Sequence, residues 1–140
     1  MKKLLISAAL VLAACGGPAG STGGVEISDA FIAEPLTGRN MTAGYFSAAN
    51  TGPDARIVAV STPIAERVEL HTHTMTNGVM KMRKVDGVDV ASGETVNFEP
   101  GGLHLMIFGV SVDEGVTEAP VTLTYASGEE VTVMAEIRPR

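Results

Sequence analysis

The chain has little cysteine and little positive charge, and these two shortages limit how its fold can be stabilised and what it can bind. Cys15 is the only cysteine among 140 residues, so no internal disulfide can form and the fold must depend on an apolar core. Ten lysines and arginines against sixteen acidic residues leave a net charge of −6. An acidic chain of this kind is a poor candidate for binding nucleic acid.

Long apolar runs are also missing. The apolar run at residues 4–12 follows two lysines and precedes small residues, which is the pattern of a cleaved secretory signal and is too short to span a membrane. Residues 12–15, Leu-Ala-Ala-Cys, resemble the lipobox of bacterial lipoproteins, in which the cysteine becomes the lipidated first residue. An ordinary cleaved signal is the alternative, but Cys15 sits where a lipobox requires it. We therefore expect an extracytoplasmic or periplasmic protein that a lipid on Cys15 holds at a membrane.

Three segments follow from this reading. Residues 1–14 are the expected signal peptide, and their loss would change the net charge from −6 to −8 because they hold two lysines and no acid. Residues 15–24 are the lipidated cysteine and a glycine-rich linker with almost nothing to bury, which predicts flexibility. Residues 25–140 suffice for one domain with a modest core, and not for two.

From residue 25 onward, short β-rich runs alternate with turn residues, and no helical stripe of useful length is present. Many short strands at this spacing predict an all-β fold, an antiparallel sandwich or barrel. The expected strands are 25–33, 42–50, 56–61, 67–75, 79–85, 95–98, 103–110, 121–126 and 131–138.

Residues 68–109 gather the groups that can bind a soft metal. They hold all three histidines of the chain and four of its seven methionines: His71, His73, His104, Met75, Met80, Met82 and Met106. Imidazole and thioether are neutral ligands that suit Cu(I). Taken singly, each residue is more simply a core methionine or a solvated histidine. A shared ligand explains the group better, because apolar residues already supply the core positions on the opposite strand faces.

The turn dipeptide Asn77-Gly78 predicts how these residues meet. Between two strand-like runs it indicates a two-residue hairpin, and a type I′ turn would set Met75 opposite Met80 and His73 opposite Met82. Strand alternation then gathers five side chains on one face. They are His71, His73, Met75, Met80 and Met82. The same alternation gives His104 and Met106 a common face, with Leu105 and Ile107 turned toward the core.

The spacing of four of these residues resembles a family signature. His71, ten residues, Met82, twenty-one residues, His104, one residue and Met106 is similar to the H-x10-M-x21-H-x-M pattern of the PCu(A)C-type periplasmic copper chaperones. The segments TAGYF (42–46), ERVELH (66–71), GVMKMR (78–83) and PGGLHLM (100–106) resemble that family as well, so the likeness covers essentially the whole domain.

The resemblance implies a cupredoxin-like Greek-key β-sandwich that holds Cu(I) at a shallow surface site. It assigns the ligands to His71, Met82, His104 and Met106. It also implies delivery of copper to the CuA centre of cytochrome c oxidase, so the expected partner is the copper-bearing oxidase subunit or another copper chaperone. We expect the protein to act as a monomer.

Two features of the residues leave alternatives open. His73 stands where many relatives carry methionine; it is either a third imidazole that improves tolerance of Cu(II) or a solvated strand histidine. A second copper ion would need His73, Met75 or Met80. The basic residues Lys81, Arg83 and Lys84 either solubilise the strand or steer the protein toward an acidic acceptor.

Enzymatic function is not expected. A blue-copper redox site needs a cysteine thiolate, and Cys15 lies outside the domain. No nucleophile setting of a hydrolytic triad is recognisable. The remaining alternative is a lipoprotein that buffers or senses copper without passing it on.

Overall fold

The computed structural model describes residues 20–22 and 24–140, so the predicted signal peptide and Cys15 lie outside the described residues. Throughout those two ranges, strands are the only regular elements, and no helix suited to crossing a membrane occurs. The strands are β1 (Gly20–Thr22), β2 (Val25–Ala33), β3 (Met41–Asn50), β4 (Ala55–Ser61), β5 (Arg67–Thr76), β6 (Val79–Lys84), β7 (Val88–Val90), β8 (Thr95–Phe98), β9 (His104–Phe108), β10 (Glu118–Tyr125) and β11 (Glu130–Arg138).

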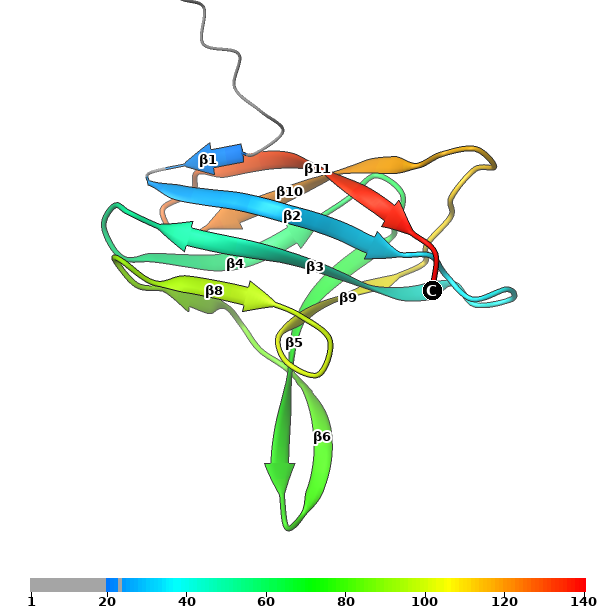
Figure 1. Ribbon diagram of the computed structural model, residues 1–140, viewed down its shortest axis with the longest axis horizontal. Coiled ribbons are helices and arrows are strands. Elements are labelled where there is room, and N and C mark those ends of the chain that lie inside the picture. Colours follow the sequence, from blue (N-terminus) through cyan, green and yellow to red (C-terminus); the bar gives the residue numbers. More distant parts are fainter. Residues whose placement is uncertain (1–19, 23) are drawn as a thin grey trace, which may run out of the picture.

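The strands form one continuous path, β6-β5-β9-β3-β2-β11-β10-β4-β7, with β1 on β2 and β8 on β3. The path folds into the layers visible in Figure 1. Neighbours in the sheet are mostly not neighbours in the chain, so connections cross between layers. The expected all-β class is confirmed, and each predicted strand is present.

Three details differ from the prediction. The pairing of β11 with β2 is parallel, whereas every other pairing is antiparallel among the described residues. The two strands come from opposite ends of the domain, so no tight turn has to join them. Strand β7 is only three residues long, too short for its alternation to be noticed. Strand β1 lies within the range expected to be linker and pairs with β2.

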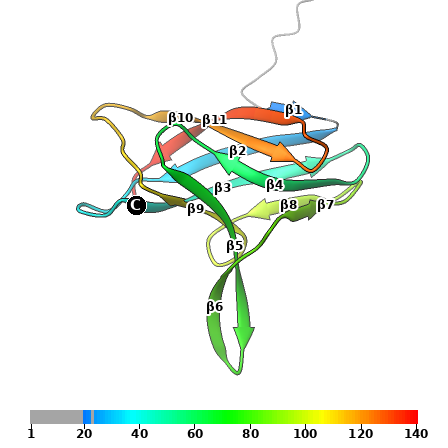
Figure 2. The ribbon, with the colours of Figure 1, turned by 180° about the vertical axis from the view of Figure 1, so that it is seen from behind.

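The core is built from the inward faces of nine strands, β2 to β5 and β7 to β11. Its centre includes Ile27, Ile57, Ile107 and Leu123, each almost wholly buried. Strand β6 contributes nothing, because all six of its residues are exposed. The outer half of β5 and all of β6 therefore form a hairpin that projects from the sandwich, as seen from both sides in Figures 1 and 2.

Tyr125 places a buried hydroxyl in this core without a hydrogen-bond partner. Its side chain is 3% exposed. Burial raises the pKa of Tyr125 to about 12, and the nearby charge of Glu129 adds to the shift. The folded chain therefore holds this phenol neutral at pH values where the unfolded chain begins to ionise it.

We expect Tyr125→Phe to leave the free energy of unfolding at pH 7 unchanged or higher, because it removes a buried hydroxyl that bonds to nothing. The wild type should lose stability as the pH rises from about 10 to about 12, since the unfolded chain loses the proton first. The Tyr125→Phe variant should lack the part of this pH-dependent loss of stability that comes from ionisation of Tyr125. Urea unfolding of both proteins across that range provides the measurement, and a variant destabilised by more than about 1 kcal/mol at pH 7 would mean that the hydroxyl has a partner.

Candidate metal centre

The register of the β5–β6 hairpin is as predicted. Met75 pairs with Met80 and His73 pairs with Met82. The turn residues Asn77 and Gly78 both have positive φ, 51° and 76° respectively. Positive φ at both central positions is the requirement of a type I′ turn, whose twist matches that of the strands.

The ladder of this hairpin brings the predicted residues close. The amide of Val85 donates to the carbonyl of Leu70 at 2.8 Å, so this pair occupies a hydrogen-bonded rung. Because the rungs of an antiparallel pair alternate, His71, His73 and Met75 fall on the non-hydrogen-bonded rungs. Facing Cα atoms are there about 4.5 Å apart, and the side chains approach more closely than on the other rungs.

The two faces of the hairpin differ completely in composition. One face, which we call the His/Met face, carries only histidine or methionine between Glu69 and Lys84. Its members are His71, His73, Met75, Met80 and Met82. The opposite face carries neither type; its members are Thr72, Thr74, Thr76, Val79, Lys81 and Arg83. The three basic residues therefore do not form one patch, because Lys84 lies on the other face from Lys81 and Arg83.

Strand β9 adds the remaining predicted residues to the inner end of the His/Met face. His104 lies directly opposite His71, and Met106 lies opposite Glu69. The ring centroids of His71 and His104 are 5.7 Å apart. The four residues of the sequence signature thus share one face of the sheet. His71 and His104 face each other, Met82 lies two residues along the strands toward the hairpin tip, and Met106 lies two residues along them toward the sandwich.

In each of the two facing histidines, one ring nitrogen is hydrogen-bonded and the other has no partner. Nδ1 of His104 donates to the carbonyl of Gly102 at 3.0 Å, and Nε2 of His71 donates to a carboxylate oxygen of Glu69 at 2.8 Å. The other nitrogens, Nε2 of His104 and Nδ1 of His71, are buried without a partner. A hydrogen bond on one ring nitrogen that fixes the tautomer and presents the other is typical of metal-ligating histidines.

Glu69 is a functional candidate that the sequence reasoning missed. Besides His71, it contacts Arg67 at 3.2 Å and Lys84 at 3.7 Å. The hydrogen bond from His71 lowers the pKa of Glu69, burial works against it, and Arg67 and Lys84 reinforce the lowering. Glu69 is thus a carboxylate at neutral pH. Its place two residues before His71, on the same strand face, was a signal available in the sequence.

The carbonyl of Gly102 was also missed, because a backbone acceptor leaves no mark in the sequence. It accepts from His104 and lies 3.3 Å from Nδ1 of His73. His73 is close to His104, with ring centroids 5.1 Å apart. Burial lowers the pKa of His104 below its ordinary value; the bond to Gly102 opposes this, and repulsion from His73 and His71 adds to it. His104 is therefore mainly neutral at pH 7, the form that binds metals.

Methionines lie beside the histidines of this face and supply further candidate ligands. Within residues 20–22 and 24–140, no three side chains of His, Cys, Asp or Glu are placed to hold an ion together. Met82 is exposed and Met106 is partly buried. The candidate centre therefore combines buried imidazoles with thioethers that solvent reaches.

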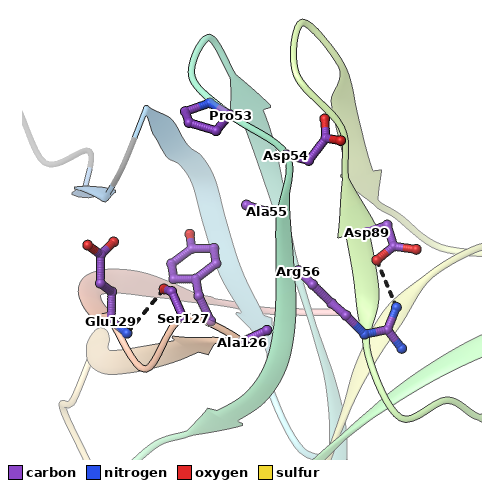
Figure 3. A pocket seen from close by; sticks show the side chains of 9 residues that line it. Pro53, Asp54, Ala55, Arg56, Asp89, Ala126, Ser127 and Glu129 are labelled. Carbon is purple, nitrogen blue, oxygen red and sulfur yellow. Dashed lines mark hydrogen bonds and ion pairs between the residues drawn. The ribbon is translucent and has the colours of Figure 1, made fainter.

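A separate hollow of about 440 Å³ lies between β4, β7 and the β10–β11 turn. Figure 3 shows the ion pair that borders it, in which Nη1 of Arg56 is 2.8 Å from Oδ1 of Asp89. None of the predicted metal-binding residues lines this hollow. The candidate metal centre and this hollow thus belong to different parts of the molecule.

Residues 25–137 match the family model described as "Putative lipoprotein LpqE-like". The protein named "Putative lipoprotein Lxx21020", from Leifsonia xyli subsp. xyli, is 29% identical over 124 residues, which are 86% of this chain and 74% of that protein.

Among solved structures, the copper-bound PCuAC domain from PmoF2 aligns with a TM-score of 0.72 at 21% identity, covering 86% of this chain and 97% of that domain. The solution structure of CuI-DR1885 from Deinococcus radiodurans aligns with a TM-score of 0.65 at 24% identity, covering 80% and 76%. At these identities the likeness establishes the fold. The resemblance to PCu(A)C-type proteins that the sequence indicated is confirmed.

The hydrogen bonds predict opposite tautomers for the two facing histidines. Long-range ¹H–¹⁵N correlation spectra of the metal-free protein should show His71 protonated at Nε2 and His104 protonated at Nδ1. Glu69→Ala should release the His71 tautomer and leave His104 unchanged, because only His71 donates to that carboxylate. Glu69→Gln, which keeps an acceptor oxygen, is the matched control. The same tautomer on both rings would contradict the arrangement.

Proposed function

The chain belongs to the LpqE-like family, and from this premise we propose that it is an extracytoplasmic copper chaperone. It binds Cu(I) through His71, Met82, His104 and Met106 and passes the ion to an acceptor protein. Copper is the cargo in this proposal, so the site must both hold the ion and release it.

The observation that carries the proposal is the pair of buried, unpartnered ring nitrogens on His71 and His104. A buried polar atom without a partner costs roughly 1–3 kcal/mol. The two atoms belong to residues that face each other across β5 and β9. A metal ion bound between them would satisfy both lone pairs at once, which supports a metal site at this position.

The ligand types favour Cu(I) over other ions. Imidazole and thioether are neutral, and thioether sulfur suits a soft monovalent ion. Mg²⁺ and Ca²⁺ prefer carboxylate and carbonyl oxygen, which this set does not supply. Methionine also forms no disulfides in an oxidising compartment, where a cysteine site would be vulnerable. The structurally similar PCuAC domain from PmoF2 is copper-bound and DR1885 was solved in its CuI form, which supports the same metal.

Delivery is the finer part of the proposal. The exposure of Met82 supports ligand exchange, because an acceptor's side chain can approach the copper from the solvent side. The acceptor we propose is the CuA site of cytochrome c oxidase or another copper chaperone. A transfer assay with such acceptors in copper-free form would separate this function from copper buffering or sensing, in which no copper would move.

We also propose that Cys15 is lipidated and tethers residues 25–140 to a membrane outside the cytoplasm. The family description and the name of the Leifsonia relative support a lipoprotein. Metabolic labelling with a fatty-acid analogue, compared between the wild type and Cys15→Ser, tests this part independently of copper.

Removal of a single ligand should weaken Cu(I) binding strongly. We expect His104→Ala and Met82→Leu each to lower the Cu(I) affinity by more than the roughly 10–100-fold typical of losing an outer hydrogen-bond partner of a metal ligand. Anaerobic competition with a chromophoric chelator measures the affinity. Met134→Leu is the control for Met82→Leu, since both methionines are 46% exposed and Met134 lies on β11. Equal affinities for Met82→Leu and Met134→Leu would exclude Met82 from the site.

His73 should matter for Cu(II) and not for Cu(I). Its ring lies beside that of His104, and Cu(II) gains more from an added imidazole than from thioethers. We expect His73→Ala to leave Cu(I) affinity nearly intact and to weaken Cu(II) binding. Paired titrations, one anaerobic with reductant and one with Cu(II), test this. A large loss of Cu(I) affinity would make His73 a primary ligand, and no change in either titration would make it a solvated strand residue.

A further inference from the structure

We propose that Met75 and Met80 form a second, outer Cu(I) site near the tip of the hairpin, through which the ion passes between the inner site and an acceptor. The inference rests on the proposed function of the inner site and adds the route by which copper enters or leaves. It concerns a pair of side chains outside the four-residue signature.

The pair has the geometry for shared binding. Met75 and Met80 face each other directly across β5 and β6, on a rung of the non-hydrogen-bonded kind, where facing Cα atoms are about 4.5 Å apart. Methionine has three flexible side-chain torsions, so the two sulfur atoms can converge on one ion. The two residues are 65% and 55% exposed respectively, which leaves room for an acceptor's ligand beside them.

Packing does not explain why methionine occupies these positions. Strand β6 contributes no residue to the core, and the hairpin tip projects from the sandwich (Figure 1). On the opposite face of the same segment, the neighbouring pair is Thr74 and Lys81, which are polar side chains of the kind expected on a solvent-exposed strand. Exposed apolar side chains are common singly, but here every position of the His/Met face from His71 to Met82 is a soft-metal ligand.

The outer pair continues directly from the inner site. Met75 and Met80 lie one same-face position beyond His73 and Met82, a separation of about 7 Å along the strands. Copper moves by ligand exchange: a bond from Cu(I) to the sulfur of Met82 breaks as a bond to the sulfur of Met80 forms. The ion keeps its single charge, and no electron or proton is transferred. Two thioethers alone leave positions open for the acceptor's own ligands.

The test compares methionine methyl NMR signals during anaerobic Cu(I) titration of three full-length proteins. All carry Cys15→Ser so that the thiol does not compete for copper. The first is otherwise unchanged, the second adds Met75→Leu with Met80→Leu, and the third adds Met134→Leu as the control. Leucine keeps the apolar volume with little effect on packing, and the signals of individual methionines report each site separately.

In the parent and in the control, the first equivalent of Cu(I) should shift the methyl signals of Met82 and Met106, and the second equivalent should shift those of Met75 and Met80. The double variant should bind the first equivalent with unchanged affinity, and its second equivalent should bind at least about tenfold more weakly. It should also give up its copper more slowly to the chelator bicinchoninate.

The outcomes separate this inference from the proposed function. If the parent binds no first equivalent at Met82 and Met106, the inner site and the proposed function fail together. If the first equivalent binds there but Met75 and Met80 never respond, the outer site alone is overturned. A response of Met75 and Met80 to the first equivalent would also overturn it, because the two residues would then belong to the inner site.

Discussion

The register of the β5–β6 hairpin is the constraint on which the candidate site depends. Side chains alternate strictly along a strand, so a slip of one residue would move His71, His73 and Met75 to the opposite face. The type I′ turn at Asn77 and Gly78 prevents such a slip by requiring positive φ at both positions. Beyond the inner part of β5, no residue of the hairpin packs in the core. The turn and the hydrogen bonds of the ladder therefore largely determine its register.

The site combines two environments because it spans the boundary between the sandwich and the projecting hairpin. At the inner end, His104 is 3% exposed and its ring is fixed by Gly102. Glu69 holds His71 in the same way. At the outer end, thioethers stand in solvent with no partner to orient them. In the proposed copper site, the histidines are therefore oriented before an ion binds, and the exposed methionines can rearrange around it.

Much of this arrangement could be predicted from the sequence, because it follows from local rules. The Asn77-Gly78 turn and the period of two fix which residues share a face. The parallel β11–β2 pairing could not be predicted, since it joins strands about a hundred residues apart and follows from the closure of the sandwich. The role of the Gly102 carbonyl also escaped, because a backbone acceptor leaves no mark in the sequence. The role of Glu69 was open to prediction from its place two residues before His71 on the same strand face, but it was missed. Pairing between distant strands is set by the whole core and leaves no periodic signal.

The same division of the site explains why the soft ligands lie outside the core. A chaperone that surrounded copper with buried ligands would have to open its core to release the ion, and the free energy of that opening would oppose transfer. Here the buried part is limited to imidazoles that the sandwich already holds in place through Glu69 and Gly102. Met80 and Met82 lie on a strand whose residues are all exposed, so their rearrangement breaks no core contact. Met106, on β9, is partly buried. Under the proposed function, the stability of the fold and the release of copper thus depend on different residues of one sheet face.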